Sequence, residues 1–399
     1  NELANQQPYG DWLKLNKMTL ADLPEPEDTQ GVDSDTLTER QKTFGYTVED
    51  LHHILDPMAV NGQEPDGSMG NDAPPAVLSD KPQPLFSYFK QRFAQVSNPP
   101  LDAIREELVT SLEIFIGSEQ NLFEETALHC QQLKLSQPII TNQELEKIRN
   151  LTSGPIQSST ISTLFPPEPG SIEKAIDRLC AAATSAIEAG SAILVLSDRG
   201  VDKNNAPIPS LLATSAVHHH LIRTGLRTKV GIVVESGEPR DVSQMAVLIG
   251  YGAGAINPYL ALETMQDMVD RQLLSNSIDY KKAEQNFIKA IDKGLLKIIS
   301  KMGISTIQSY RGAQIFEAVG LNSGVIEKYF TWTASQVEGL SLDQIEEETL
   351  RRHRSAYIGR NASWRDNLDV GGAYQWRRDG EYHMYNPDAI AKLQHAART

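Results

Sequence analysis

Short polar runs that follow apolar, β-branched stretches are the part of this sequence best suited to chemistry. They read Ser197-Asp198-Arg199-Gly200, Glu235-Ser236-Gly237-Glu238, Asn257-Pro258-Tyr259 and, further on, 305–309. In α/β proteins, ligands bind beyond the carboxyl ends of the strands, so these runs are consistent with a polar site at one edge of a sheet. The alternative, which is the commoner role of such residues, is that they only end strands and begin helices.

Two other motifs resemble binding sites but have the wrong surroundings. The stretch 250–254 has the glycines of a phosphate loop, yet a helix is predicted before it and a strand after it, the reverse of the dinucleotide-binding order. We therefore expect a tight turn. His218, His219 and His220 are consecutive in a predicted helix, where neighbours point about 100° apart and cannot bind one metal ion together. We expect one packed and two exposed histidines, no metal site and no catalytic residue.

The run Gly67-Ser68-Met69-Gly70-Asn71-Asp72 is harder to dismiss. Its two glycines permit unusual backbone angles and close approach of another group. Met69 between them is a flexible apolar side chain. Such a loop can line a passage or press against a flat ligand. Equally, it can be a turn that one methionine anchors to the core.

Six strand–helix units must position these residues, and they begin near residue 136. The strands are expected at 138–141, 161–165, 192–196, 230–234, 254–257 and 304–307, and their helices at 142–150, 171–189, 208–224, 241–250, 260–274 and 311–319. Consecutive units of this kind form a parallel sheet with right-handed crossovers. The expected fold is α/β, either an open doubly wound sheet or a complete or partial (β/α) barrel.

The segments around this core differ in composition. Residues 1–50 are polar and are expected to form a linker or an arm that wraps a neighbour. Residues 56–100 are rich in Pro and Gly but keep many apolar side chains, which predicts an ordered loop region with a helix near 85–96. Residues 265–300 are predicted to be helical and are rich in lysine.

Composition excludes several classes of protein. The 399 residues carry a formal net charge of −15, which argues against nucleic-acid partners and against an anionic membrane surface. No apolar stretch is long enough to span a membrane. Two cysteines, Cys130 and Cys180, supply neither a disulfide framework nor a complete iron–sulfur cluster. The chain starts at Asn1 without an initiator Met, so we expect a processed start or a piece of a longer protein.

Several long strings resemble glutamate synthase, in its large or single subunit. The first is Asp66-Gly67-Ser68-Met69-Gly70-Asn71-Asp72-Ala73-Pro74; the others are 76–83, 88–96, 196–200, 256–261, 300–317 and 380–387. The resemblance covers nearly the whole chain. It implies a central domain over 51–375, with its parallel core at 136–320, after an arm at 1–50 from the glutaminase side. Residues 376–399 would then begin the FMN-containing synthase domain.

The departures from the family suggest which part is present. The N-terminal nucleophilic cysteine of the glutaminase, the three-cysteine cluster of the [3Fe-4S] centre and the terminal β-helix have no counterpart in this sequence. The resemblance implies that FMN and the cluster belong to the full enzyme and that none is complete in this fragment. The expected partners are the glutaminase and FMN domains of the same polypeptide, with ammonia as the channelled intermediate, in the cytoplasm or the plastid stroma.

The resemblance also gives the glycine-flanked loop a role. In the family this loop lies near the flavin and the ammonia passage, which implies that Met69 and Gly70, and less directly Ser68 and Asn71, contact FMN or line the passage. The expected function is to connect the two catalytic domains and to help form the ammonia tunnel, with the fragment inactive by itself. The alternatives are an autonomous FMN-binding (β/α)-barrel oxidoreductase and a non-catalytic interaction scaffold.

Overall fold

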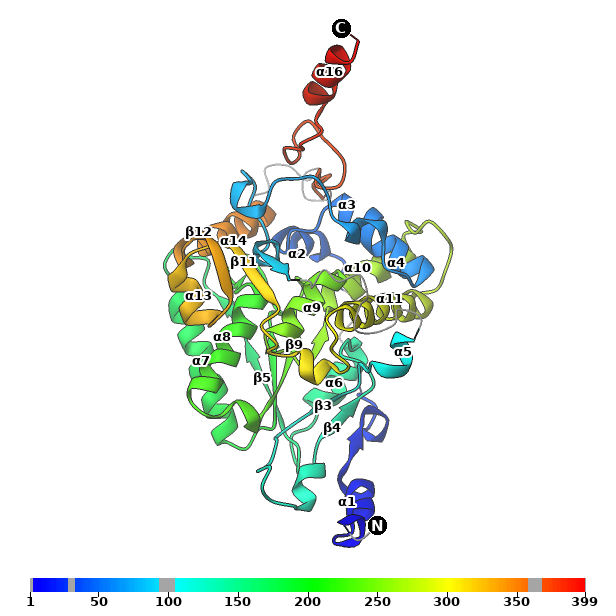
Figure 1. The fold of residues 1–399 in the computed structure, drawn as a ribbon, viewed down its shortest axis with the longest axis vertical. Helices are drawn as coiled ribbons and strands as arrows, with labels where there is room; N and C mark the ends of the chain where they lie inside the picture. The colour runs from blue at the N-terminus through cyan, green and yellow to red at the C-terminus, as the bar shows by residue number, and fades with distance from the viewer. Residues whose placement is uncertain (1–2, 28–32, 93–104, 358–367, 399) are drawn as a thin grey trace.

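The computed structural model describes residues 3–27, 33–92, 105–357 and 368–398, which form an α/β body from which both ends of the chain project (Figure 1). Helix α1 (Tyr9–Asn16) lies at one end of the molecule and helix α16 (Pro387–Ala396) at the opposite end. No helix in the described ranges is long and apolar enough to cross a membrane.

A parallel sheet forms the centre of the body. Its order is β10 (Ala255–Asn257), β9 (Gly231–Glu235), β7 (Ile193–Ser197) and β5 (Ser158–Ser162), and Ile139 adds a parallel bridge to Ile256. Every residue of β7, β9 and β10 is buried, because helices cover both faces. The expected α/β class with parallel βα units is confirmed. Within the described residues the sheet does not close into a barrel.

Each strand leads into a helix, as the alternation predicts. These helices are α6 (Asn142–Arg149), α7 (Ile172–Glu188), α8 (Ser210–Arg223), α9 (Val242–Gly250) and α10 (Tyr259–Asp270), and the long α11 (Tyr280–Lys301) follows. The register pairs Ser162 with Ser197, Ser197 with Glu235, and Glu235 with Asn257, so the strands end at one level. The polar runs after the strands therefore meet at one edge of the sheet.

The turn between α9 and β10 is tight, as expected for the glycine motif at 250–254. Gly252 has a φ of +119°, and a Cβ atom there would lie 2.5 Å from His218 Nδ1. His218 is buried and accepts a hydrogen bond from Arg227 Nε at 2.9 Å, and burial lowers the pKa of His218 to about 2. His219 and His220 are half-buried rather than exposed, which corrects that expectation.

The prediction of a sixth strand–helix unit, at 304–319, is wrong. Thr306 makes only a single bridge to Ser111, and the expected helix at 311–319 is replaced by strand β11 (Phe316–Leu321). Positive φ angles at Gly312 and Gln314 interrupt any helix there. Residues of β11 then alternate between buried and half-buried, which is the period of a strand.

Strand β11 belongs to a second, three-stranded sheet. It pairs with β12 (Ala334–Leu340) in parallel and with β2 (Phe89–Gln91) antiparallel. The helix expected at 85–96 is also wrong, because a 3₁₀ turn, η6 (Leu85–Tyr88), leads directly into β2. Residues 93–96 lie outside the described residues.

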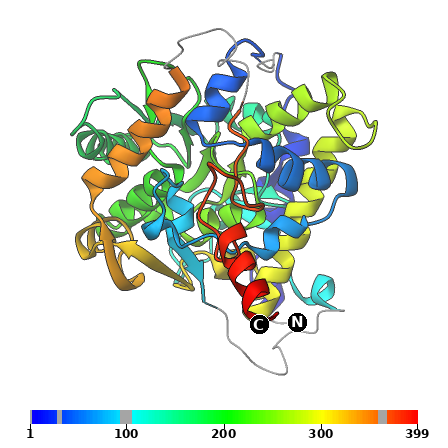
Figure 2. The ribbon, with the colours of Figure 1, turned by 90° about the horizontal axis from the view of Figure 1, so that it is seen from above.

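The remaining elements surround these two sheets (Figure 2). Strand β1 (Met18–Thr19) pairs with β4 (Leu133–Leu135), and α2 (Leu37–Thr43) packs against α14 (Leu342–Tyr357) and α10. Further elements are α3 (Val48–Asp50), α4 (Asp56–Asn61), α5 (Glu106–Val109), β3 (Ile114–Ile116), β6 (Leu164–Phe165), β8 (Ala206–Pro207), α12 (Ile307–Tyr310) and α13 (Ser323–Tyr329), with the short helical turns η1 (Leu3–Asn5), η2 (Leu20–Asp22), η3 (Leu51–Leu55), η4 (Asp66–Met69), η5 (Ala76–Leu78), η7 (Ala127–Cys130) and η8 (Arg227–Lys229).

Candidate functional site

The polar runs meet beyond the carboxyl end of the central sheet, where they form a buried ion-pair network. Arg199 Nε lies 2.6 Å from Glu235 and Arg199 Nη1 lies 2.8 Å from Glu263, and both carboxylates are almost fully buried. Arg149 also pairs with Glu235, and Arg40 of α2 pairs with Glu263. Each buried carboxylate thus has two arginine partners, which is the arrangement that offsets the cost of desolvating a charge.

Asp198 lies in the same network but has no cationic partner within hydrogen-bond distance among the described residues. Its carboxylate accepts hydrogen bonds from Ser236 Oγ at 2.5 Å and from the Gly237 amide at 3.0 Å. Burial raises the pKa of Asp198 to about 7, although these hydrogen bonds oppose the shift. The Tyr259 ring covers the network, since Arg199 stacks on it at 4.1 Å from the ring centroid.

Carboxylates also occupy the helix N-termini at this edge. Glu238 accepts hydrogen bonds from the Ser210 amide (2.9 Å) and hydroxyl (2.6 Å) where α8 begins. Glu346 of α14 accepts the amides of 170–172, at 2.7 to 2.9 Å, where α7 begins. Helix N-termini are the usual place for a phosphate in an α/β protein. Here the chain's own carboxylates bind those amides, so the sheet edge is filled by protein.

The second candidate is the glycine-flanked loop, which lies on the surface. Residues Asp66–Met69 form η4, and Gly70 follows with a φ of +92°. A Cβ atom on Gly67 would lie 2.8 Å from Ile54 Cδ1 and 3.2 Å from Tyr374 Cε1, so only glycine fits there without a shift. A Cβ atom on Gly70 would meet nothing within 4 Å. Gly67 therefore packs the loop onto the body, while Gly70 faces open space.

The four residues of this loop that the sequence singled out are not all placed by the structure. Gly70 and Asn71 line a cavity of about 590 Å³ together with Gly67, Gln91, Lys297 and Tyr374, among others. Asn71 Oδ1 also accepts a hydrogen bond from the Ala73 amide at 3.1 Å. The backbone of Ser68 and Met69 belongs to η4, but their side chains lie outside what the structure describes.

Glu49 of α3 holds the turn against which the loop packs. Its carboxylate accepts four consecutive backbone amides, from Gly372 (2.8 Å), Ala373 (2.9 Å), Tyr374 (3.1 Å) and Gln375 (3.3 Å). Burial alone would raise the pKa of Glu49, but these four hydrogen bonds lower it below its ordinary value. Glu49 thereby fixes Tyr374, whose ring lies beside Gly67.

A second tie joins the loop to the tail through His383. His383 Nδ1 lies 2.5 Å from Asp72 Oδ1, and His383 Nε2 lies 2.8 Å from the Gly372 carbonyl oxygen. Burial would lower the pKa of His383, yet its hydrogen bonds to Gly372 and Asp72 raise it above the ordinary value. The hydrogen bond from His383 lowers the pKa of Asp72, so each group favours the charged form of the other.

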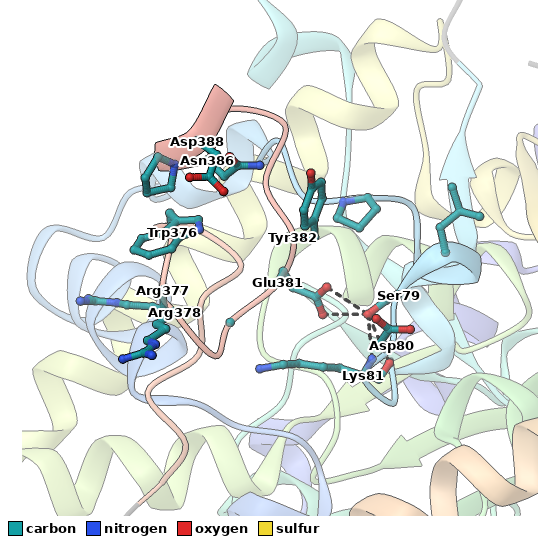
Figure 3. A pocket seen from close by; sticks show the side chains of 14 residues that line it. Ser79, Asp80, Lys81, Trp376, Arg377, Arg378, Glu381, Tyr382, Asn386 and Asp388 are labelled. Atoms are coloured by element: carbon teal, nitrogen blue, oxygen red, sulfur yellow. Dashed lines mark hydrogen bonds between the residues drawn. The ribbon is translucent and has the colours of Figure 1, made fainter. Parts of the chain in front are cut away.

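Glu381 makes the third tie (Figure 3). Its carboxylate accepts hydrogen bonds from Ser79 Oγ, at 2.9 and 3.0 Å, and from Gln83 Nε2 at 2.7 Å. A groove of about 590 Å³ lies here, and its lining includes the exposed side chains of Leu78, Trp376 and Tyr382. We call residues 66–83 and 371–385 the loop–tail unit; His383 and Glu381 join its two segments to each other, and Glu49 secures the turn at 372–375.

Comparison with known proteins identifies the family of this chain. The family described as glutamate synthase central domain matches residues 39–322. The chain is 46% identical over 397 residues to the glutamate synthase [NADPH] large chain of Bacillus subtilis, and 41% identical over 408 residues to ferredoxin-dependent glutamate synthase 2 of Synechocystis. The chain belongs to the glutamate synthase family.

The alignment also shows that the glutamate synthase relatives are much longer. It covers 100% and 99% of this chain, but only 26% of either relative. Among solved structures, the flavin-binding domain of baker's yeast flavocytochrome b2 aligns over 78% of this chain and 100% of its own, at 10% identity and a TM-score of 0.34. The chain is therefore one part of a larger glutamate synthase polypeptide.

The cofactor that the glutamate synthase family implies does not fit the starts of α7 and α8. The phosphate of FMN needs backbone amides, and those at these two helix starts already bind Glu346 and Glu238. Beyond β7 and β9, the sheet edge is occupied by the Arg199–Glu235–Glu263 network. Within the described residues, no cluster of His, Cys, Asp and Glu has the arrangement of a metal site.

Sequence reasoning missed the residues that hold the loop–tail unit together. Glu49, Glu381 and His383 have no spacing pattern that sets them apart, and Glu49 lies 323 residues from Gly372. The pair Gly371-Gly372 is the one local signal, because both glycines have positive φ angles. A Gly-Gly pair predicts an unusual turn but does not predict which carboxylate occupies it.

Proposed function

We propose that residues 51–375 form the central, connecting domain of a glutamate synthase, with residues 1–50 as an arm from the glutaminase side and residues 376–399 as the start of the synthase domain. In this proposal the domain joins a glutaminase domain to an FMN-containing synthase domain, within an enzyme that converts L-glutamine, 2-oxoglutarate and two electrons into two molecules of L-glutamate. The loop–tail unit carries the proposal. The Asp72–His383 hydrogen bond holds the loop at 66–72 against the chain just before α16, which leads away from the body (Figure 1). Glu381 joins the same stretch to Ser79, and Glu49 secures the turn at 372–375 against which Gly67 packs.

The loop then borders the passage by which ammonia travels between the catalytic domains. Gly70 has open space where a side chain would stand, and it lines the cavity beside Tyr374 together with Asn71. Such a passage must be poor in water, because water would protonate ammonia to ammonium, whose transfer into an apolar path is costly. In this proposal Met69 and Gly70, with Ser68 and Asn71 beside them, contact FMN or the passage from the side of this domain.

The rival functions predict different surroundings for the same residues. An autonomous flavin barrel needs free backbone amides beyond its strands, whereas Glu238 and Glu346 take them here. A pure scaffold needs no defined geometry at Gly70. The Asp72–His383 tie and the packing of Gly67 against Tyr374 favour a defined geometry, since a loop that only fills space needs no such support.

The substitution Met69→Trp in the full-length enzyme tests the proposal. Coupled turnover yields two glutamates for each glutamine consumed, whereas glutamine hydrolysis alone yields one. We expect the ratio of glutamate formed to glutamine consumed to fall from two towards one, because a bulky ring narrows the passage. Leu122→Trp, at a position 92% exposed, is the matched control and should keep the ratio at two. An unchanged ratio for Met69→Trp favours the scaffold.

We also propose that this chain alone neither hydrolyses glutamine nor forms glutamate. The nucleophile of the glutaminase and the FMN site would both lie in other parts of the polypeptide, with the cytoplasm or the plastid stroma as the compartment. An assay of the chain with glutamine, 2-oxoglutarate and a reductant checks this. Turnover, or a yellow chain that retains FMN through gel filtration, would support the flavin-barrel alternative.

A further inference from the structure

Helix α11 carries a concentration of positive charge that the rest of this acidic chain lacks. Its 22 residues contain six lysines and two acidic residues, while the chain as a whole has a net charge of −15. Lys282, Lys289, Lys293, Lys297 and Lys301 are all exposed. At about 100° per residue they fall within roughly a third of the helix circumference, along about 28 Å of its length. We call these five residues the lysine ridge.

Within the described residues, repulsion between the lysines of the ridge is largely uncompensated. Lys289, Lys293, Lys297 and Lys301 follow at intervals of four, and each like-charged pair at that spacing costs about 0.2–0.5 kcal/mol. Among the described residues, the only ion pair on the ridge joins Lys297 Nζ to Glu64 at 3.6 Å. Of the other acidic groups nearby, Glu284 accepts a hydrogen bond from the Tyr280 hydroxyl and Glu144 caps α6. Asp292, on α11 itself, is half-buried, and no ion pair joins it to a ridge lysine among the described residues.

Two hollows flank the lysine ridge. The cavity beside Gly67 and Gly70 is lined by Lys297 and Lys301. A groove of about 680 Å³ between α6 and α11 is lined by four lysines, Lys289 and Lys293 among them, and by the acidic residues Glu144, Glu284 and Asp292. A surface that is hollowed on both sides of a line of positive charge has the shape and charge to accept an acidic partner.

We propose that the lysine ridge binds an acidic surface in the part of the same polypeptide that lies outside residues 1–399. The relatives are about four times as long as this chain, so most of their length lies outside the part that aligns with it. A tethered partner is present at an effective concentration in the millimolar range, at which screened charge contacts suffice. A second copy fits less well, because a line of lysines cannot pair with itself about a two-fold axis. The proposal deepens the proposed connecting function by naming the surface that joins the domains.

Zero-length carbodiimide crosslinking of the full-length enzyme, followed by peptide mass spectrometry, tests this proposal. The reagent joins a lysine amine to a carboxylate only where the two are in contact. We expect Lys289, Lys293, Lys297 and Lys301 to be joined to Asp or Glu residues of the same chain beyond position 399 or before position 1. Links confined to residues 1–399, links to a second copy or to a separate protein, or co-purifying nucleic acid on the ridge would each overturn the proposal.

A charge-reversed variant makes the test quantitative. Lys289→Glu, Lys293→Glu and Lys301→Glu together should reduce the yield of links between Lys297 and the other domains at least about tenfold, because the ridge then repels an acidic surface. The matched control is Lys174→Glu, Lys203→Glu and Lys229→Glu, at three exposed positions away from α11. An equal yield in the two variants contradicts the proposal. Because the readout needs no turnover, its failure is distinct from a failure of the coupling test with Met69→Trp.

Discussion

The carboxyl edge of the central sheet and the loop–tail unit use the same interaction with different results. In both, a buried carboxylate accepts consecutive backbone amides, from 170–172 to Glu346 in the first and from 372–375 to Glu49 in the second. At the sheet edge the carboxylates and their arginines fill the place where α/β proteins bind ligands. In the loop–tail unit the carboxylate secures a turn while Gly70, close by, remains open.

The difference shows that polar residues beyond the strands do not by themselves make an open site. The sheet edge has the expected location and polar residues, yet its charges pair with one another. The loop–tail unit lies over the start of α9, since Gly67, Gly70 and Tyr374 share a cavity with Asp241–Gln244, and it presents exposed residues where the chain leaves the body. A network that satisfies itself stabilises the fold, whereas a loop that is held but not covered is available to another domain.

The largest expected effect comes from breaking the sheet-edge network with Glu235→Gln. Arg149 and Arg199 would lose their shared carboxylate in a buried site, which typically costs about 3–5 kcal/mol of unfolding free energy. Urea denaturation followed by circular dichroism measures the loss. Glu347→Gln is the control, because the exposed Glu347–Arg354 pair should contribute less than about 1 kcal/mol. Similar losses for the two variants would mean that the network does not close the sheet edge.

A smaller effect is expected from Glu49→Ala in the loop–tail unit. Four amides at 372–375 would lose their acceptor, at a cost of about 1–3 kcal/mol, less than the loss at Glu235 because water can reach the turn. Hydrogen exchange of these four amides should become faster, while the amides of β7 and β9 stay protected. Glu49→Gln keeps one acceptor oxygen, so exchange of these amides should be faster than in the unsubstituted chain and slower than in Glu49→Ala. If Glu49→Ala leaves the exchange unchanged, Glu49 does not hold the turn.

The smallest effect is a pH dependence of the tie between Asp72 and His383. The pKa of His383 is raised on folding, so its contribution is complete below about pH 6.5 and is lost as the pH rises through the folded value. The pKa of Asp72 is lowered, so its contribution is complete above about pH 3.9 and is lost as the pH falls through the folded value. The tie is therefore strongest between these limits.

Hydrogen exchange at the Tyr385 amide, which donates to Asp72 Oδ2 at 3.1 Å, measures this tie. After correction for the intrinsic rate, protection should decline from pH 6 to pH 8.5 in the unsubstituted chain. His383→Gln should show low protection at both values. A wild-type profile that does not change with pH would separate His383 protonation from the stability of the loop–tail unit.

Local sequence patterns predicted the central sheet well. Apolar strands such as Ile193–Ser197 and Gly231–Glu235 lie between clear helix signals, and burial on both faces makes them uniformly apolar. The second sheet was missed because Ala334–Leu340 is largely exposed and Phe316–Leu321 continued a strand–helix pattern that predicted a helix. The strands expected at 192–196, 230–234 and 254–257 match β7, β9 and β10, whereas the one expected at 161–165 overlaps β5 only at 161–162 and the one at 138–141 is a single bridge at Ile139. The sheet formed by β2, β11 and β12 was not predicted.

In the candidate sites, too, local patterns were predictable and long-range contacts were not. The runs at 197–200 and 235–238 were correctly placed at the sheet edge. Whether they bind a ligand or only end strands and begin helices stayed open, because their ion pairs involve Arg40 and Glu263, which are far apart in sequence. Gly67 and Gly70 were singled out by their type. The residues that support their loop, Glu49 and His383, could not be predicted, since the contacts they make cross about 300 residues.

The 323 residues between Glu49 and Gly372 also set an order of events during synthesis. At about 5–20 residues per second, a ribosome needs roughly 16–65 s to add the turn after it has added the carboxylate. During that interval the loop at 66–72 lacks Tyr374, and Glu49 has none of its four amide partners. The loop therefore reaches its final form only after residues 372–383, more than 300 residues further along the chain, have been added.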